Sequence, residues 1–88
     1  MTNASRIKRL KFRAWHRGTR EADFMIGCFF DAHHSSWGEP ELEWFEALLD
    51  EEDVEIMAWA LGSAPVPARF EGAQMGAFRK LDFVEIPR

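Results

Sequence analysis

The chain has 88 residues, a net charge of −4 and a single cysteine, Cys28. This length suffices for one small domain, and the lone cysteine excludes an internal disulfide and a zinc site built from several thiolates. No apolar run approaches the roughly 20 residues that span a bilayer, and the first residues lack the apolar core of a signal peptide, so we expect a soluble, cytoplasmic protein.

The charges are separated along the sequence. Seven of the eleven Lys and Arg residues lie in residues 1–20, and twelve of the fifteen Asp and Glu residues lie in residues 21–55. Such a polarised molecule can steer a charged partner toward one end, whereas its overall acidity disfavours general binding of polyanions. A protein partner is therefore favoured over nucleic acid.

The first predicted helix covers residues 6–15. Ser5 can act as its N-cap, and residues 1–4 are polar, so we expect this short segment to be flexible. Gly18 supplies the conformational freedom for a tight turn at 16–18. A basic helix is thus expected to end at a short connection that contains glycine.

An almost continuous apolar segment from Arg20 to about His34 predicts a long central helix. Its length and its lack of alternation favour a helix over a buried strand. Gly27 lowers the helix propensity by about 1 kcal/mol relative to alanine, unless it allows another helix to approach closely.

Two further helices are predicted, each with one apolar stripe. Pro40 suits the first turn of the third helix. Asp53 can cap the fourth helix, and Gly62 is a good stop signal. The inward stripes are expected to be Leu42, Phe45, Leu48 and Leu49 in the third helix and Val54, Met57, Ala58 and Leu61 in the fourth.

The last predicted helix covers residues 70–81 and follows an extended segment at 64–67, although two glycines inside the helix weaken this prediction. Residues 83–88 are expected to be flexible. Together these elements predict an all-α fold, a compact five-helix bundle that forms a single domain over residues 1–88.

No group of residues forms a recognisable catalytic centre. The side chains of His33 and His34 would point about 100° apart on a helix, and no further ligand completes a metal site. His16 has no nearby nucleophile or acid with which to form a relay. Cys28 lies in the most apolar helix, where packing is favoured over redox chemistry. We therefore expect no enzyme activity, no metal and no stably bound cofactor.

The segment Arg17-Gly18-Thr19-Arg20-Glu21 is open to two interpretations. In a structural one, Glu21 reaches back to a helix N-cap at Gly18, or pairs with Arg17 four residues before it. In a functional one, Gly18 lets another backbone approach while Arg17 and Glu21 offer a donor fork and an acceptor beside it. Both interpretations can hold in one molecule.

Two other features have open alternatives. The acidic run at residues 50–55 fits either a surface for a basic partner or ordinary solvated helix ends. Trp59 lies off the expected inward stripe of its helix, so it fits either the core or an interface.

Several segments combine into a recognisable pattern. It comprises a basic and apolar segment, an Arg-Gly-x-x-Glu motif followed by Asp, a Phe-Phe pair, and a downstream Leu-Leu to Asp to Trp to Gly segment. The residues are 9–15, Arg17, Gly18, Glu21, Asp23, Phe29, Phe30, Leu48, Leu49, Asp53, Trp59 and Gly62. In this combination the chain resembles the SdhE family, also named succinate dehydrogenase assembly factor 2.

The resemblance implies an assembly factor that is not itself a catalyst. Such a protein binds the flavoprotein subunit of succinate dehydrogenase or of fumarate reductase and promotes covalent attachment of FAD to that partner. We expect a monomer, with a dimer as the alternative, and no binding to nucleic acid or membranes. The predicted partner-binding residues are Arg13, Trp15, His16, Arg17, Gly18, Glu21, Asp23 and Trp59.

Two other functions fit parts of the sequence. A small helical regulator would bind nucleic acid through the basic first helix, in which Phe12 and Trp15 alternate with Lys and Arg. Acidic residues within a Debye length of about 8 Å would oppose those phosphate contacts. An antitoxin-like interaction module is the third hypothesis.

Overall fold

The computed structural model describes residues 3–81, with side chains from residue 4 onward. Within this range the chain is all-α without a strand, and the predicted bundle of five helices is confirmed. The helices are α1 (Asn3–Trp15), α2 (Arg20–His33), α3 (Glu39–Leu49), α4 (Asp53–Leu61) and α5 (Ala73–Lys80), with short 3₁₀ turns η1 (His34–Ser36) and η2 (Ala68–Phe70).

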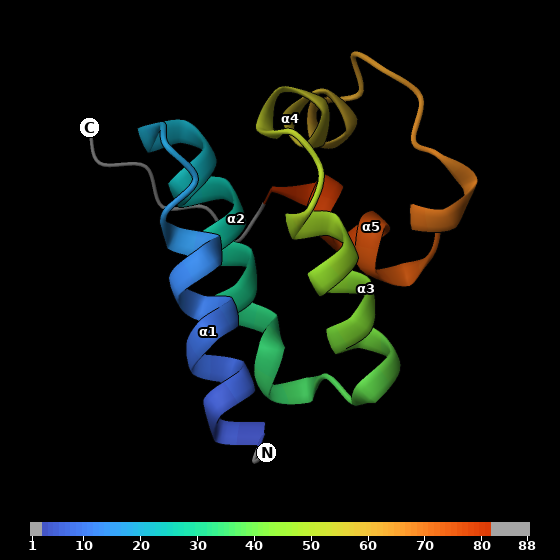
Figure 1. Cartoon of the computed structure of the whole chain (residues 1–88). Helices are drawn as coiled ribbons and strands as arrows, with labels where there is room; N and C mark the ends of the chain where they lie inside the picture. The colour runs from blue at the N-terminus through green and yellow to red at the C-terminus, as the bar shows by residue number, and fades with distance from the viewer. Residues whose placement is uncertain (1–2, 82–88) are drawn as a thin grey trace.

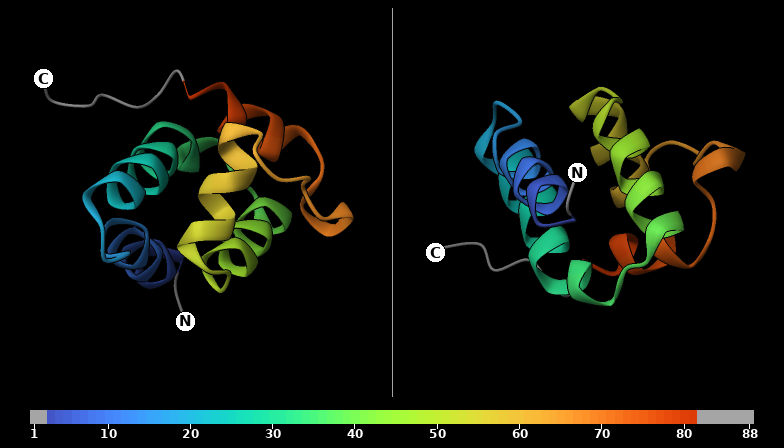
Figure 2. Two further views of the ribbon diagram at one scale, coloured as in Figure 1. Left: turned by 90° about the horizontal axis from the view of Figure 1, so that it is seen from above. Right: turned by 60° about the horizontal axis from the view of Figure 1, so that its bottom comes forward.

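The helices form a hairpin and a second group beside it. α1 and α2 run antiparallel and side by side, and α3 lies next to them (Figure 1). α4 lies across one end of the molecule, where it packs with α5 (Figure 2). As a result, the α1–α2 connection and the α3–α4 connection lie at the same end.

Aromatic rings fill the core between the hairpin and the other helices. Phe29 and Phe30 of α2 are fully buried. The Phe29 ring lies 5.0 Å from Phe78 of α5, and the Phe30 ring lies 5.4 Å from Phe45 of α3, measured between centroids. The prediction that α2 is the central helix is therefore confirmed, because this pair of adjacent residues joins it to α3 and α5 while α1 packs along it.

Gly27 lets the Trp15 indole lie directly on α2. A methyl group at Gly27 would lie 2.8 Å from Cε3 of Trp15 and closer still to Cδ2 and Cε2. Any larger residue would therefore collide with the ring. This finding confirms the alternative in which Gly27 is present for close contact between helices, despite its cost in helix propensity.

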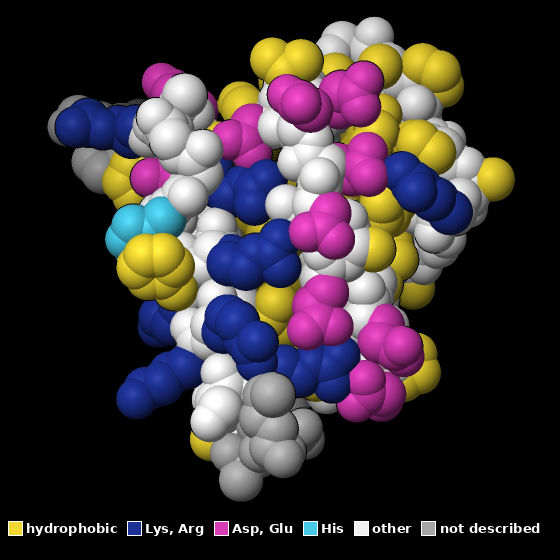
Figure 3. Space-filling model, in the orientation of Figure 1, with side chains coloured by type: hydrophobic (Ala, Val, Ile, Leu, Met, Phe, Trp, Pro, Cys, Tyr) yellow, Lys and Arg dark blue, Asp and Glu magenta, His cyan; other side chains and the backbone are white. Residues whose placement is uncertain are grey.

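Ion pairs join α1 to α3 along one face of the molecule. The Arg6 guanidinium binds the carboxylates of Glu39 and Glu46, each at 2.7 Å, and Arg13 binds Asp50 at 2.8 Å. Figure 3 shows Lys and Arg side chains of α1 facing Asp and Glu side chains over α3. Part of the basic charge of α1 is thus neutralised within the molecule, which weakens the nucleic-acid hypothesis.

The ion pair of Glu46 predicts a dependence of stability on pH. The hydrogen bond from Arg6 holds the pKa of Glu46 below its usual range. A carboxyl group with a lowered pKa stabilises the fold above its unfolded-state pKa of about 4.3, and this contribution is lost as the pH falls through the folded-state pKa. The Tm of the wild-type protein should therefore fall on acidification below about pH 4. The Tm of Glu46→Gln should fall by less over the same pH range.

The effect of Glu46 should be small because its side chain is 37% exposed. Thermal unfolding followed by circular dichroism at pH 3 to 7 would measure it. Glu43→Gln, at an exposed carboxylate of the same helix, is the control and should keep the wild-type acid response. Identical acid responses in Glu46→Gln and wild type would contradict the prediction.

The first helix begins earlier than predicted. It starts at Asn3, so Ser5 lies inside the helix and does not cap it. Residues 3–4, which were expected to be flexible, are helical. For residues 1 and 2, which lie outside the described range, flexibility stays a prediction.

The last helix is shorter than predicted. Phe70 belongs to η2, and α5 begins only at Ala73. Gly72 between them has a φ of 145°, a conformation that glycine adopts far more readily than other residues. This glycine interrupts the helix predicted from residue 70, whereas residues 83–88 lie outside the described range.

α4 buries a different face from the predicted one. Ile56, Trp59 and Ala60 are buried, whereas Val54 is 80% exposed and Leu61 is 62% exposed. The predicted inward stripe was therefore wrong at its two ends, although Met57 is half-buried and packs against the core. Asp53 is the first helical residue after the N-cap Glu52 rather than the cap itself. Because α4 is apolar around most of its circumference, two stripes have helical spacing and the sequence does not distinguish them.

Candidate functional site

The α1–α2 connection holds the Arg-Gly-x-x-Glu motif in a defined turn. Thr19 is the N-cap of α2, and its Oγ1 accepts a hydrogen bond from the Ala22 amide at 3.2 Å. Gly18 has a φ of 117°, which confirms the predicted need for glycine. A Cβ at Gly18 would have no neighbouring atom within 4 Å. Gly18 thus faces open space, where another molecule can approach its backbone.

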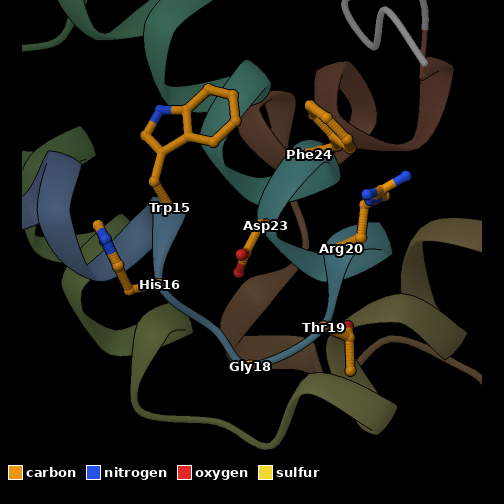
Figure 4. Close-up of a pocket in the computed structure, with 7 residues that line it drawn as sticks. All are labelled: Trp15, His16, Gly18, Thr19, Arg20, Asp23 and Phe24. Atoms are coloured by element: carbon orange, nitrogen blue, oxygen red, sulfur yellow. The ribbon is translucent and has the colours of Figure 1, made fainter. Parts of the chain in front are cut away.

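Asp23 holds this turn from the inside. Its carboxylate accepts a hydrogen bond from the backbone amide of Arg17, and its own amide donates to the Thr19 carbonyl at 2.9 Å. Figure 4 shows the Asp23 carboxylate pointing into the concave side of the connection. Asp23, which lies near the start of α2, therefore helps to fix the shape of the α1–α2 connection.

The Arg17 side chain clamps this connection to the one between α3 and α4. Its Nε donates to Asp53 Oδ1 at 2.7 Å, and its Nη1 and Nη2 donate to the carbonyls of Leu49 at 2.9 Å and Glu51 at 3.1 Å. Only 11% of the Arg17 side chain is exposed. The Arg17 guanidinium, which was predicted to donate hydrogen bonds to a partner, thus donates them within the protein itself.

Glu21 has neither of the local roles that the sequence allowed. The N-cap is Thr19 rather than Gly18, and the side-chain partners of Arg17 lie in and around the α3–α4 connection. The Glu21 side chain is exposed on the second residue of α2. Of the three residues that define the motif, Glu21 is therefore the side chain placed to meet another molecule.

A pocket of about 560 Å3 lies beside the turn. Its lining residues are Trp15, His16, Gly18, Thr19, Arg20, Asp23 and Phe24. The indole of Trp15 meets the Phe24 ring edge-on at 6.0 Å between centroids. His16 is exposed, and its ring stacks on Phe12 at 4.0 Å. The pocket therefore combines aromatic faces with polar groups.

The structure brings together only part of the predicted partner-binding set. Trp15, His16, Gly18 and Asp23 share the pocket. Arg13, by contrast, lies in the ion pairs between α1 and α3. The remaining aromatic residue, Trp59, is 5% exposed and packs on Phe70 with 5.4 Å between ring centroids, so the structure favours its core interpretation.

Three residues of the pocket were not in the predicted set: Thr19, which caps α2, and the pair Arg20 and Phe24. Arg20 and Phe24 are four residues apart on α2 and therefore lie on one face of the helix. Phe24 was assigned to the apolar run that makes up most of α2, in which the outward face is hard to recognise. Its spacing from the charged Arg20 was the one available indication that it reaches the surface.

The chemistry of the described residues fits a contact surface. Among residues 4–81 no three His, Cys, Asp or Glu side chains are placed to hold a metal ion. In the same part of the chain, no helix has the length and apolar character needed to cross a membrane. The turn offers an exposed carboxylate, an open backbone and aromatic faces, which are groups suited to binding a protein.

Comparisons with known proteins agree with this description. The sequence model of the family described as "Flavinator of succinate dehydrogenase" matches residues 8–81. The FAD assembly factor SdhE of Acetobacter pasteurianus is 44% identical over 64 residues, which cover 73% of this chain and 59% of the relative. Succinate dehydrogenase assembly factor 2, mitochondrial, of Mycosarcoma maydis is 35% identical over 66 residues, which cover 75% of this chain and 28% of the relative.

A third relative shows the same partial coverage. The protein of that same name from Dictyostelium discoideum is 33% identical over 64 residues, which cover 73% of this chain and 45% of the relative. The chain thus spans less than two thirds of the length of these relatives. Since the family match covers most of the chain and includes the Arg-Gly-x-x-Glu turn, the chain belongs to the SdhE family of succinate dehydrogenase assembly factors.

Proposed function

We propose that this protein binds the flavoprotein subunit of succinate dehydrogenase, and that of fumarate reductase, and promotes covalent attachment of FAD to it. The observation that carries the proposal is the turn at residues 16–19. Its backbone is open at Gly18, and its shape is fixed by the hydrogen bonds of Arg17 and Asp23. A surface that is already ordered loses little conformational freedom when it binds.

In this proposal the protein acts by positioning and not by catalysis. Covalent flavinylation needs the flavin held against a histidine of the flavoprotein in a geometry close to that of the reaction. A small protein that binds one arrangement of the flavoprotein domains raises the population of that arrangement. FAD then becomes attached to the partner, and the assembly factor, a cytoplasmic monomer, is released without it.

Glu21→Ala should lower covalent flavinylation without unfolding the protein. Glu21 is exposed and makes none of the hydrogen bonds that hold the turn, so its removal leaves the fold intact. In a strain that lacks the native gene, the variant should leave much less covalent flavin on the flavoprotein subunit than wild type does. Flavin fluorescence in a denaturing gel measures this amount.

Glu43→Ala is the matched control, because it removes an exposed carboxylate from α3 and should behave as wild type. Thermal unfolding should give all three proteins the same Tm to within about 3 °C. If Glu21→Ala supports wild-type flavinylation, Glu21 does not belong to the docking surface. If deletion of the gene leaves the flavin band unchanged, the proposed function itself is wrong.

A further inference from the structure

α4 exposes an apolar stripe that faces solvent. Val54, Met57, Ala58 and Leu61 share this face. Val54 and Leu61 at its ends are 80% and 62% exposed, whereas Met57 and Ala58 between them are half-buried and Met57 also touches the core. The opposite face of α4 already supplies the core contacts through Ile56, Trp59 and Ala60. A second apolar face on a surface helix indicates that another molecule covers it.

The stripe forms one wall of a groove whose other wall is α2. The groove has a volume of about 260 Å3, and its lining residues are Arg20, Glu21, Phe24, Met25, Met57 and Leu61. Four of its six lining side chains are apolar, those of Phe24, Met25, Met57 and Leu61. Such a lining suits an apolar side chain of another protein.

The groove lies next to the pocket beside the α1–α2 turn. Arg20 and Phe24 line both hollows, so they form the boundary across which a single partner would lie. Glu21, which the proposed function places against the flavoprotein, is itself part of the groove. A partner seated on the turn would thus meet the α4 stripe as well.

Charges around the groove indicate the kind of partner. Glu52 and Glu55 are exposed at the amino-terminal end of the stripe and Glu21 is exposed across the groove, while the exposed Arg20 is the one cation among the lining residues. No ion pair among residues 4–81 involves these three carboxylates, whereas Asp53 and Glu51 are paired with Arg17 and Arg69. Figure 3 shows acidic and hydrophobic side chains next to each other over α4. The three carboxylates outnumber Arg20, so the surroundings complement an apolar side chain with positive charge beside it.

We infer that this groove seats an apolar side chain of the flavoprotein partner, carried on a segment with Lys or Arg next to it. The inference rests on the proposed function and extends the docking surface from the turn to α4. A second copy that placed its own α4 in the groove is disfavoured as the occupant, because it would bring the acidic ends of two α4 helices together.

Binding of the purified full-length chain to the purified, FAD-free flavoprotein subunit tests the inference. Leu61→Glu places a charge in the groove and should weaken binding at least about tenfold by calorimetry, because burial of a leucine side chain accounts for roughly that factor. Leu61→Ala should weaken it less. Ala73→Glu adds the same charge at an exposed position of α5 and should bind as wild type.

Charge reversal tests the second half of the inference. Glu55→Lys should weaken binding severalfold at low salt and reduce its dependence on salt, whereas Glu43→Lys on α3 should not. A photo-crosslinking residue at position 61 should attach to an apolar residue of the flavoprotein that has Lys or Arg beside it. Attachment to a second copy of this chain would overturn the inference.

The outcomes separate this inference from the proposed function. If the wild-type chain neither binds the flavoprotein nor raises its covalent flavin, the proposed function fails. If wild type does both, and both Leu61 variants bind equally well with an unchanged Tm, only the groove is wrong. Because Leu61 is mostly exposed, neither variant should unfold the protein.

Discussion

Replacing Arg17 by alanine should lower the free energy of unfolding by about 2–4 kcal/mol and the Tm by on the order of 10–20 °C. The change leaves Asp53 without its cation and two carbonyl groups, those of Leu49 and Glu51, without their donor. An unsatisfied group near the interior costs more than the lost bond itself. For a domain of this size the expected loss is a large share of total stability.

The matched control for Arg17 is its neighbour in the motif, Arg20. Its side chain is exposed, so Arg20→Ala should change stability by less than about 0.5 kcal/mol. Arg17→Lys keeps the charge but loses the planar fork, and should fall between wild type and alanine. Chemical denaturation followed by circular dichroism measures all four proteins. An Arg17→Ala protein with wild-type stability would show that the clamp contributes nothing.

Gly27→Ala should destabilise the protein by about 1–3 kcal/mol, although alanine is the better helix former. The new methyl group would occupy the space of the Trp15 ring. Helix propensity alone would stabilise α2 by about 1 kcal/mol, so the sign of the result decides between local propensity and packing. Thermal unfolding, with tryptophan fluorescence as a report on Trp15, measures both effects.

A second substitution isolates the cause of the Gly27 effect. In a Trp15→Leu background the ring is gone, and Gly27→Ala should become neutral or stabilising by up to about 1 kcal/mol. This reversal of sign is expected only if the collision with Trp15 is responsible. Destabilisation of the same size in both backgrounds would place the cause elsewhere in α2.

The buried face of a helix could be predicted from the sequence where its residues divide cleanly into an apolar and a polar face. In α3 the predicted stripe from Leu42 to Leu49 is buried at every position. In α4 the same reasoning selected the exposed face, because apolar residues occupy both sides and periodicity gives no preference. Tertiary contacts with Phe70 on one side, and not the local pattern, determine which face is inside.

The candidate site shows a similar division. The need for glycine at position 18 follows from local backbone geometry and could be predicted. The role of Arg17 could not, because its partner Asp53 is 36 residues away in the sequence and only the folded chain brings them together. A motif residue that resembles a binding group can therefore be the residue that holds the binding surface in shape.

The ion pairs between α1 and α3 have a consequence for synthesis of the protein. The ribosome makes the N-terminus first, so Arg6 and Arg13 precede their acidic partners by 33–40 residues. At about 5–20 residues per second, roughly 2–8 s pass before those carboxylates exist. During that interval the nascent hairpin has a net positive charge, and the charges of Arg6 and Arg13 are masked only when α3 and the residue after it, Asp50, have been made.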